Sequence, residues 1–250
     1  MKGCGLASAF RTLTILPLPG RESDSPATAL YWFVPVGLFL AGILYGVAWI
    51  ASSLGLELVG GVVLTGLLAI LTRAFHLDGL ADMVDGFGGG WTRDRVLEIM
   101  KDSHIGAFGV IALVLVLMLK AVAFTAIIEN GTIFPLLYIP VLSRFLVVLQ
   151  SVANPYARKE GGTAGRLVIE SRPRHMFVSI LWVIVVVMVS GQKYLMTLII
   201  MTAVGLLVTV LLAIRARRRI GGVTGDILGA TVELSECTMI VALAILLYSA

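Results

Sequence analysis

The chain has 250 residues, of which 58% are hydrophobic and only 14% are charged, and its formal net charge is +4. A soluble domain of average composition has roughly a quarter of its residues charged, so this composition excludes an ordinary soluble enzyme. Successive apolar runs leave no polar stretch long enough for a second domain. We therefore expect residues 1–250 to form a single all-α domain, a polytopic helical bundle in the lipid bilayer.

The first 20 residues, MKGCGLASAFRTLTILPLPG, contain an apolar stretch that Arg11 and Thr12 interrupt. This pattern lacks the continuous apolar core of a cleaved signal peptide. It predicts a retained helix that lies at the membrane interface or re-enters the membrane.

Apolar runs fill most of the remaining sequence. A transmembrane helix needs about 20 mostly apolar residues, and about seven segments are candidates, the run at 176–190 being the shortest. The seven are residues 30–54, 58–75, 105–128, 132–152, 176–190, 194–214 and 227–249.

Lysine and arginine are unevenly divided between the two sides of this predicted bundle. The N-terminal segment and residues 76–104, 153–175 and 215–226 share one side, and with the adjoining span ends they hold 16 of the 19 positive residues. Positive residues favour the cytoplasmic side, so we expect a multi-pass protein of the inner cell membrane with its active-site loops in the cytoplasm. The run Arg215–Arg219 favours contact with anionic headgroups. Aromatic residues are not interleaved with basic ones, so we expect no nucleic acid partner.

An acidic motif, FHLDGLADMVDGFGGG at residues 75–90, follows the second predicted span. If that span continues as a helix past Phe75, then Asp78, Asp82 and Asp85 face the same way, because they are four and seven residues apart. We expect them at the cytoplasmic mouth of the bundle. Ionisable groups near membrane depth are usually functional, although such acids are also found solvated or ion-paired at helix ends.

A second acidic pair, Glu98 and Asp102, lies four residues apart beyond the glycine-rich turn. Two helices joined by this turn could direct all five carboxylates into one cleft. Oxygen ligands without paired cysteine or histidine favour Mg²⁺ or Mn²⁺ over zinc. Because Mg²⁺ usually combines one or two carboxylates with substrate phosphates, the motif indicates phosphoryl chemistry.

Other polar residues lie close to the predicted spans. His76 could act as a base, contact phosphate or simply lie at the interface. Arg144, inside the fourth span, needs either a carboxylate partner or a phosphate. The last span opens with Asp226, Glu233 and Glu236; an acid at a helix start also complements the helix dipole.

The longest motif, HLDGLADMVDGFGGG followed by RDRVLEIMKDSHIGAFG, closely resembles the cobalamin synthases, which are integral membrane enzymes also called adenosylcobinamide-GDP ribazoletransferases. The resemblance extends to FRTLTILPLP, the serine and arginine at 143 and 144, NPYARKEGG and GDILGATVELSE, in family order over essentially the whole chain. It implies that adenosylcobinamide-GDP is joined to α-ribazole, or to α-ribazole 5′-phosphate, with release of GMP and dependence on a divalent metal. This is the nucleotide-loop assembly step of coenzyme B12 synthesis, and we expect the 5′-hydroxyl of ribazole to be the nucleophile.

With that reaction we assign roles to individual residues. The predicted metal ligands are Asp78, Asp82, Asp85, Glu98, Asp102 and Asp226. The predicted catalytic residues are Asp82, His76, Arg95 and Lys101, and the predicted substrate contacts are Arg144, Asn154, Arg158, Lys159 and Glu233.

Two other functions remain open at this stage. Membrane prenyltransferases also bind a diphosphate through Mg²⁺ and aspartates. A cation-coupled transporter would also carry acids in a helical bundle, but it predicts acids near the bilayer midplane. Small-residue stretches such as GLFLAG suit a homo-oligomer, and association with other B12-assembly enzymes is a further expectation.

Overall fold

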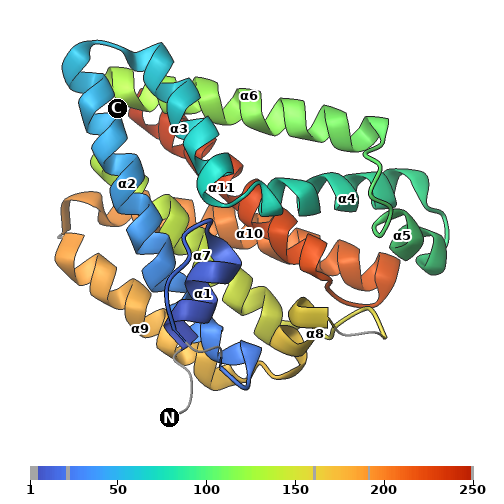
Figure 1. Cartoon of the computed structure of the whole chain (residues 1–250). Coiled ribbons are helices and arrows are strands. Elements are labelled where there is room, and N and C mark those ends of the chain that lie inside the picture. Colours follow the sequence, from blue (N-terminus) through green and yellow to red (C-terminus); the bar gives the residue numbers. More distant parts are fainter. Residues whose placement is uncertain (1–4, 21–22, 160–161, 191, 249–250) are drawn as a thin grey trace.

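The computed structural model describes residues 5–20, 23–159, 162–190 and 192–248, and within these ranges every regular element is a helix (Figure 1). The expected all-α fold is confirmed. The elements are α1 (Gly5–Leu13), η1 (Pro26–Trp32), α2 (Phe33–Leu54), α3 (Glu57–Leu71), α4 (Phe75–Gly89), α5 (Arg93–Ile99), α6 (Ala107–Asn130), η2 (Phe134–Leu137), α7 (Tyr138–Ala153), α8 (Gly162–Ile169), α9 (Pro173–Ser190), η3 (Gln192–Tyr194), α10 (Leu195–Ile220) and α11 (Gly225–Tyr248).

Six helical segments of the described chain are long and apolar enough to cross a membrane. They comprise η1 with α2, then α6, η2 with α7, α9, η3 with α10, and α11. The pair α3 and α4 makes a seventh if it counts as one broken span. The expected multi-pass architecture is confirmed, and the shortest predicted span, 176–190, lies within the 18-residue helix α9.

The acidic motif is not a continuation of the preceding span, and that expectation is wrong. Helices α3 and α4 meet at an angle of 88°. Arg73 and Ala74 between them have φ values of 55° and 52°, a left-handed conformation that is unfavourable for residues with a Cβ atom. The bend is closed by local hydrogen bonds, including Ala74 N to Ala69 O at 2.7 Å. The motif therefore forms a helix of its own with a new direction.

Helix α4 lies between α6 and α11 and contacts both. Figure 1 shows α4 running alongside α6, with α5 beyond the end of α4. Small residues allow close approach of helices: a Cβ atom at Gly79 of α4 would lie 2.9 Å from the carbonyl oxygen of Asp226 in α11. The bend thus brings the part of α4 that carries Asp78 and Asp82 against the first turn of α11.

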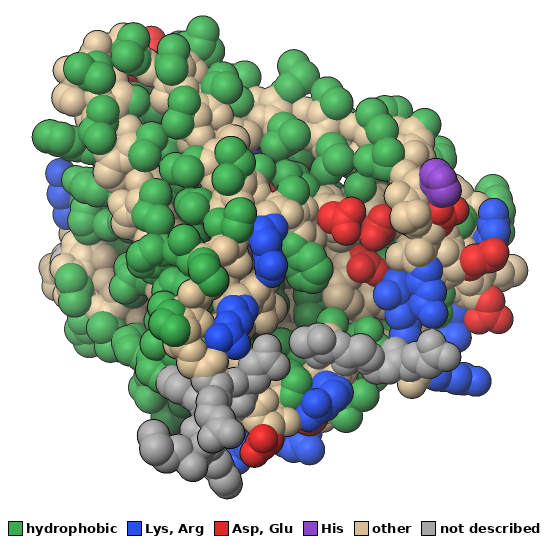
Figure 2. Space-filling model, viewed as in Figure 1, with side chains coloured by type: hydrophobic (Ala, Val, Ile, Leu, Met, Phe, Trp, Pro, Cys, Tyr) green, Lys and Arg blue, Asp and Glu red, His purple; other side chains and the backbone are tan. Residues whose placement is uncertain are grey.

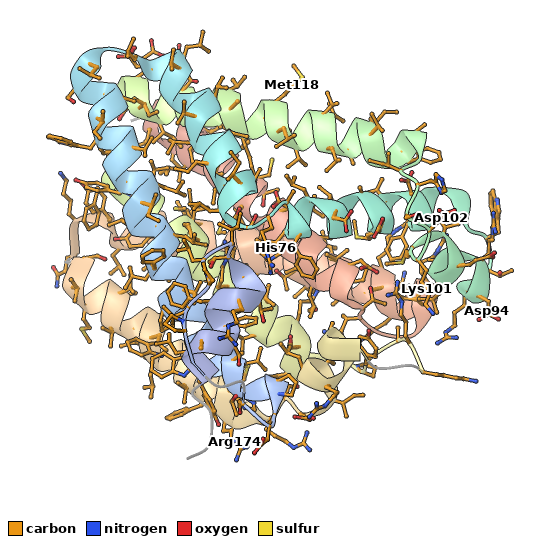
Figure 3. The ribbon with its side chains drawn as sticks, viewed as in Figure 1. His76, Asp94, Lys101, Asp102, Met118 and Arg174 are labelled. Carbon is orange, nitrogen blue, oxygen red and sulfur yellow. The ribbon has the colours of Figure 1, made fainter. Side chains whose placement is uncertain are left out.

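The outer faces of α6, α9 and α10 carry large apolar side chains, such as Met118, Phe177 and Leu207, that are about 60% exposed. Figure 2 shows the same apolar character over much of one face, and Met118 points outward in Figure 3. Large exposed apolar surfaces mark contact with another apolar phase. In a chain of this composition that phase is lipid.

Candidate functional site

Two aspartates of α4 line a cavity of about 500 Å³ together with residues that follow α5. Asp78 is exposed and Asp82 half-buried. Lys101 and Asp102 line the same cavity, at the end of the molecule where α5 lies (Figure 3). The predicted common face of Asp78 and Asp82 is therefore present, since both side chains reach one space.

Asp226 approaches this pair from the first turn of α11. Its backbone packs against Gly79, which lies between the two aspartates in the sequence. Its side chain accepts a hydrogen bond from Thr224 Oγ1 at 3.2 Å. Asp82 lies within electrostatic range of both Asp226 and Asp78, so three carboxylates from two helices share one region.

A basic group lies beside these acids. Arg158 Nη2 donates to Asp226 Oδ2 at 2.8 Å and to Met100 O at 3.1 Å. Arg158 and Lys159 line a second cavity of about 470 Å³, and Lys101 belongs to the linings of both cavities. In Figure 2 acidic and basic side chains accordingly gather side by side over α4 and α5.

The loop that carries Arg158 is held by main-chain hydrogen bonds to the segment before α11. Ala157 N donates to Val223 O at 2.8 Å, and Val223 N donates to Pro155 O at 2.9 Å. Arg93 of α5 adds bonds to Ile220 O and Ala157 O, at 3.0 and 2.6 Å. These contacts fix the position of Arg158 relative to Asp226.

Part of the basic run at the end of α10, for which contact with lipid headgroups stays a prediction, also holds the protein together. Arg217 donates to Ala153 O at 2.5 Å and to Asn154 Oδ1 at 2.7 Å. Arg219 donates to the carbonyl oxygens of Phe87, at 3.1 Å, and of Gly90. Both guanidinium groups therefore tie neighbouring segments to the end of α10.

Asn154 has its amide oxygen and nitrogen engaged within the protein. Besides accepting from Arg217, its amide nitrogen donates to Gln150 O at 3.0 Å and to Gln150 Oε1 at 2.7 Å. The residue is buried. Its predicted contact with substrate is therefore replaced by a structural role at the end of α7.

The second acidic pair divides between the two cavities. Glu98 lines the basic one and pairs with Arg95 Nη1 at 2.9 Å, whereas Asp102 lines the acidic one. Arg95 lines neither cavity. Hydrogen bonds from His104, first from its backbone N–H and then from its ring, lower the pKa of Asp102. The predicted joint contribution of Glu98 and Asp102 to one metal site is not present in this arrangement.

Asp85 has a different role from the other aspartates of α4. It is buried, and its two carboxylate oxygens accept the backbone N–H groups of Gly106, at 2.7 Å, and Gly109, at 2.8 Å. The first N–H groups of a helix have no partner within the helix, so Asp85 caps α6. We remove it from the predicted metal ligands.

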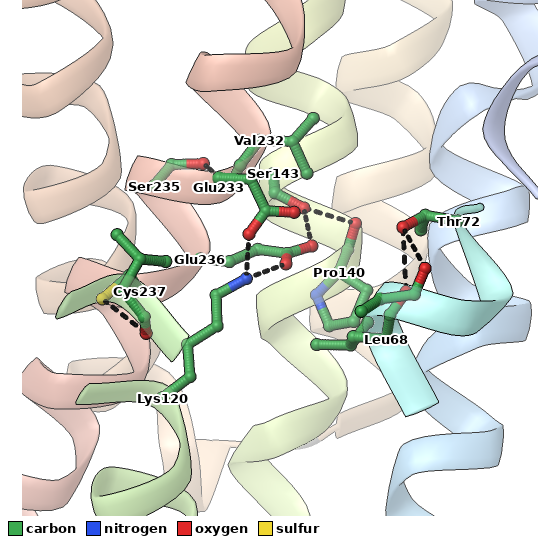
Figure 4. A network of polar contacts seen from close by, with 12 residues as sticks. Leu68, Thr72, Lys120, Pro140, Ser143, Val232, Glu233, Ser235, Glu236 and Cys237 are labelled. Atoms are coloured by element: carbon green, nitrogen blue, oxygen red, sulfur yellow. Dashed lines mark hydrogen bonds and ion pairs between the residues drawn. The ribbon is translucent and has the colours of Figure 1, made fainter. Parts of the chain in front are cut away.

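Arg144 and Glu233 belong to a charge network inside the bundle. Figure 4 shows its members Lys120, Ser143, Glu233 and Glu236. Lys120 Nζ lies 2.6 Å from Glu233 and 3.0 Å from Glu236, and Arg144 pairs with the other oxygen of Glu236. Ser143 Oγ donates to Glu236 at 3.1 Å. Each of these charged side chains is at most 5% exposed.

This burial removes Arg144 and Glu233 from the predicted substrate contacts, because neither reaches a cavity that opens toward the aspartates. Of the two roles open for Arg144, ion pairing is the one found. Lys120 was not among the predicted site residues, although a lysine within an apolar span is itself a signal of a buried partner. The positive charges of Lys120 and Arg144 balance the negative charges of Glu233 and Glu236 within the network.

His76, two residues before Asp78, faces away from the acidic cavity. Its side chain is buried, and its Nδ1 atom has no hydrogen-bond partner in the described structure. It lines a separate, mainly apolar cavity with Phe75 and Val232. It is therefore not in position to act as a base beside Asp78 and Asp82.

Within the described residues, no group of three or more histidine, cysteine, aspartate or glutamate side chains is arranged to hold a metal ion by itself. Asp78 and Asp82 line the acidic cavity, and the backbone of Asp226 packs against Gly79 between them. Their carboxylates are oxygen donors of the kind that Mg²⁺ prefers. Mg²⁺ usually takes only one or two carboxylates and completes its shell with water and phosphate oxygens. Carboxylates of this number suit a metal whose remaining ligands are water and phosphate oxygens.

Comparison with known proteins gives one consistent result. Residues 5–244 match the family model described as cobalamin-5-phosphate synthase. A protein of Chlorobium phaeovibrioides named adenosylcobinamide-GDP ribazoletransferase is 40% identical over 233 residues, which cover 93% of each chain.

Further relatives with that name cover almost the full length. The protein of Prosthecochloris aestuarii is 40% identical over 249 residues, or 98% of each chain. That of Syntrophobacter fumaroxidans is 39% identical over 251 residues, covering 96% of this chain and 97% of the relative. No solved structure matches the chain.

Proposed function

The chain belongs to the cobalamin-5-phosphate synthase family, and from this premise we propose how its two adjoining cavities carry out the family's reaction. The protein is a transferase of coenzyme B12 synthesis, an adenosylcobinamide-GDP ribazoletransferase. It joins adenosylcobinamide-GDP to α-ribazole or α-ribazole 5′-phosphate and releases GMP. Membership of this family excludes the alternative prenyltransferase and transporter functions.

The family description corrects one expectation about the nucleophile. A product that carries a phosphate at position 5 retains the 5′ oxygen of ribazole on that phosphate. The 5′-hydroxyl is then blocked, so a secondary hydroxyl of the ribose attacks. Its oxygen forms a bond to the phosphorus attached to cobinamide, the bond from that phosphorus to the bridging oxygen breaks, and GMP leaves with the bridging oxygen.

The proposal rests mainly on one observation: acidic residues and basic residues line adjoining cavities on either side of the Arg158–Asp226 ion pair. Asp78 and Asp82 line one cavity, Arg158 and Lys159 line the other, and Lys101 lines both. A diphosphate with its metal presents negative oxygens and a positive ion within a few ångströms. The adjoining cavities match that alternation of charge.

We assign Mg²⁺, or Mn²⁺ in its place, to Asp78, Asp82 and Asp226. Bound there with substrate, the ion would neutralise charge on the diphosphate and on the departing GMP. Lys101, Arg158 and Lys159 bind phosphate oxygens and orient the donor. Glu98 lines the basic cavity and Asp102 lines the acidic one with its carboxylate bonded to His104, whereas Arg95 lines neither. A carboxylate that lines the acidic cavity accepts the proton of the attacking hydroxyl.

We place this site on the cytoplasmic side of the inner cell membrane. The segments that build it, 76–104, 153–175 and 215–226, contain most of the lysine and arginine residues of the chain, and such segments stay in the cytoplasm. Association with a second copy or with other B12-assembly enzymes stays a prediction.

The experiment that tests the function uses the purified full-length protein in lipid. It is incubated with Mg²⁺, adenosylcobinamide-GDP and α-ribazole 5′-phosphate, and GMP is measured over time. We expect GMP to appear in equal amount to the cobalamin 5′-phosphate, and only when both substrates are present. Release of pyrophosphate from a prenyl donor, with no GMP from the corrinoid, would contradict the proposal.

A further inference from the structure

A third cavity, of about 90 Å³, lies beside the proposed catalytic site on the other face of α4. Phe75 and His76 of α4 line it, whereas Asp78 and Asp82 line the acidic cavity. Aromatic and aliphatic side chains from α2, α7 and α11, among them Phe33, Val147 and Val232, complete the wall. The function proposed above leaves this cavity without a role.

The cavity has two polar side chains in its described lining, Thr12 and His76. Thr12 Oγ1 donates to Ser8 O at 2.8 Å and is therefore satisfied. His76 is only 4% exposed, and its buried Nδ1 has no partner. A buried ring nitrogen is unfavourable without a hydrogen bond, so an occupant that reaches Nδ1 of His76 would supply the partner that this nitrogen lacks.

Resting on the proposed function, we propose that this cavity receives the benzimidazole ring of the ribazole acceptor. That base is flat and mostly apolar, with one unsubstituted ring nitrogen that accepts a hydrogen bond. Phe33 and Phe75 offer aromatic contact, and His76 donates to the ring nitrogen. Binding sites of this kind are mainly apolar with a few polar groups that fix orientation.

The position of the cavity agrees with this occupant, and its size admits part of the ring system. A volume of about 90 Å³ accepts the edge of a ring system and leaves the ribose outside the mouth. Gly225 lines the cavity and Asp226 follows it in the sequence, so a ribose at the mouth has its hydroxyls next to the carboxylate group. The attacking oxygen is thereby directed toward the diphosphate.

A polar cavity of about 250 Å³ adjoins the apolar one and shares Thr12 and Leu167 with it. Ser8 and Arg11 line this polar space, which suits the 5′-phosphate of the acceptor. Figure 2 shows a hollow in the surface. The acidic side chains over α4 lie on one side of it, and basic side chains over α1 and the α3–α4 junction lie on the other. Base, ribose and phosphate can therefore be accommodated together on one face.

The test compares two valine-to-phenylalanine variants of the full-length protein in lipid. Val232→Phe fills the proposed base site, whereas Val210→Phe makes the same change in a hollow between α7 and α10. We expect Val232→Phe to raise KM for α-ribazole 5′-phosphate at least ten-fold and to leave KM for adenosylcobinamide-GDP within two-fold. Val210→Phe should change neither value.

Free 5,6-dimethylbenzimidazole provides a second readout that does not depend on how Val232→Phe folds. It should compete with the acceptor, and not with the donor, in the wild-type protein, and His76→Phe should weaken this competition at least ten-fold. His76→Gln, which keeps a donor, should weaken it less.

Failure of the inference is distinct from failure of the proposed function. If the wild type releases no GMP, the function is wrong. If the wild type turns over, but neither Val232→Phe nor His76→Phe alters the acceptor KM or the competition by the free base, the assignment of this cavity is wrong. A cavity filled by a lipid chain would give equal changes in both KM values, and that result would also overturn it.

Discussion

Arg158 and Asp226 form an ion pair, with Nη2 and Oδ2 2.8 Å apart, in which the two side chains are only 18% and 19% exposed. The pair joins the loop after α7 to the first turn of α11. It stands between a cavity with two aspartates and one with several basic residues. Asp226 is therefore held beside Asp78 and Asp82 by a residue that also lines the basic cavity, where we propose that phosphate binds.

Replacement of Arg158 tests this double role. Arg158→Gln removes a charged hydrogen-bond donor from the proposed phosphate site and from Asp226. Because hydrogen bonds to charged groups contribute about 1.5–3 kcal/mol, we expect kcat/KM to fall roughly 10- to 100-fold. Arg158→Lys should recover part of the loss. GMP release measures both variants, and Arg166→Gln, in an exposed pair with Glu170, is the control. Wild-type activity in Arg158→Gln would contradict this role.

Gly79 tests whether close approach of α4 and α11 matters for activity. A Cβ atom there would lie 2.9 Å from Asp226 O and 3.0 Å from Asp226 Cα, so Gly79→Ala must push the aspartates of the two helices apart. We expect at least a ten-fold loss of GMP release. Gly66→Ala in α3 meets nothing within 4 Å and should retain activity. Equal activities of the two variants would show that the contact is dispensable.

Asp85 should behave as a structural residue and not as a metal ligand. Asp85→Asn leaves one of the two N–H groups at the start of α6 without its acceptor, and an unsatisfied buried group costs about 1–3 kcal/mol. We expect a lower midpoint of thermal unfolding in detergent and an unchanged Mg²⁺ concentration for half-maximal activity. A large shift in that Mg²⁺ concentration would return Asp85 to the metal site.

Lys120 should affect stability through its two carboxylate partners. Lys120→Met leaves Glu233 uncompensated inside the bundle, and removing one partner of a buried ion pair typically costs about 3–5 kcal/mol. The double variant Lys120→Met with Glu233→Gln should be less destabilised, because it also removes the unpaired charge. Thermal unfolding in detergent compares the two, and a double variant less stable than the single one would exclude this account.

The sequence predicted those features that depend on local spacing. Asp78 and Asp82 are four residues apart, and any helix places such residues on one face. The apolar runs predicted the spans because length and composition are sufficient for that purpose. The same local reasoning grouped Asp85 with the other two aspartates.

The remaining features depend on contacts between distant segments. Asp85 differs from Asp82 because Gly106 and Gly109 direct their N–H groups at it. Arg144 pairs with Glu236, 92 residues away, so its two possible roles could not be separated by spacing. The bend before α4 requires positive φ at Arg73 and Ala74, residue types that do not favour it.

Magnesium titration of Asp82→Asn tests the central claim most directly. GMP release from adenosylcobinamide-GDP and α-ribazole 5′-phosphate is measured in lipid after removal of divalent metal and at increasing Mg²⁺, with Glu57→Gln, at the start of α3, as the control. We predict that the wild type and the control lose activity without metal and regain it with Mg²⁺, while Asp82→Asn stays folded and nearly inactive at every concentration. Substantial turnover by Asp82→Asn at the wild-type Mg²⁺ requirement would contradict the proposed metal site.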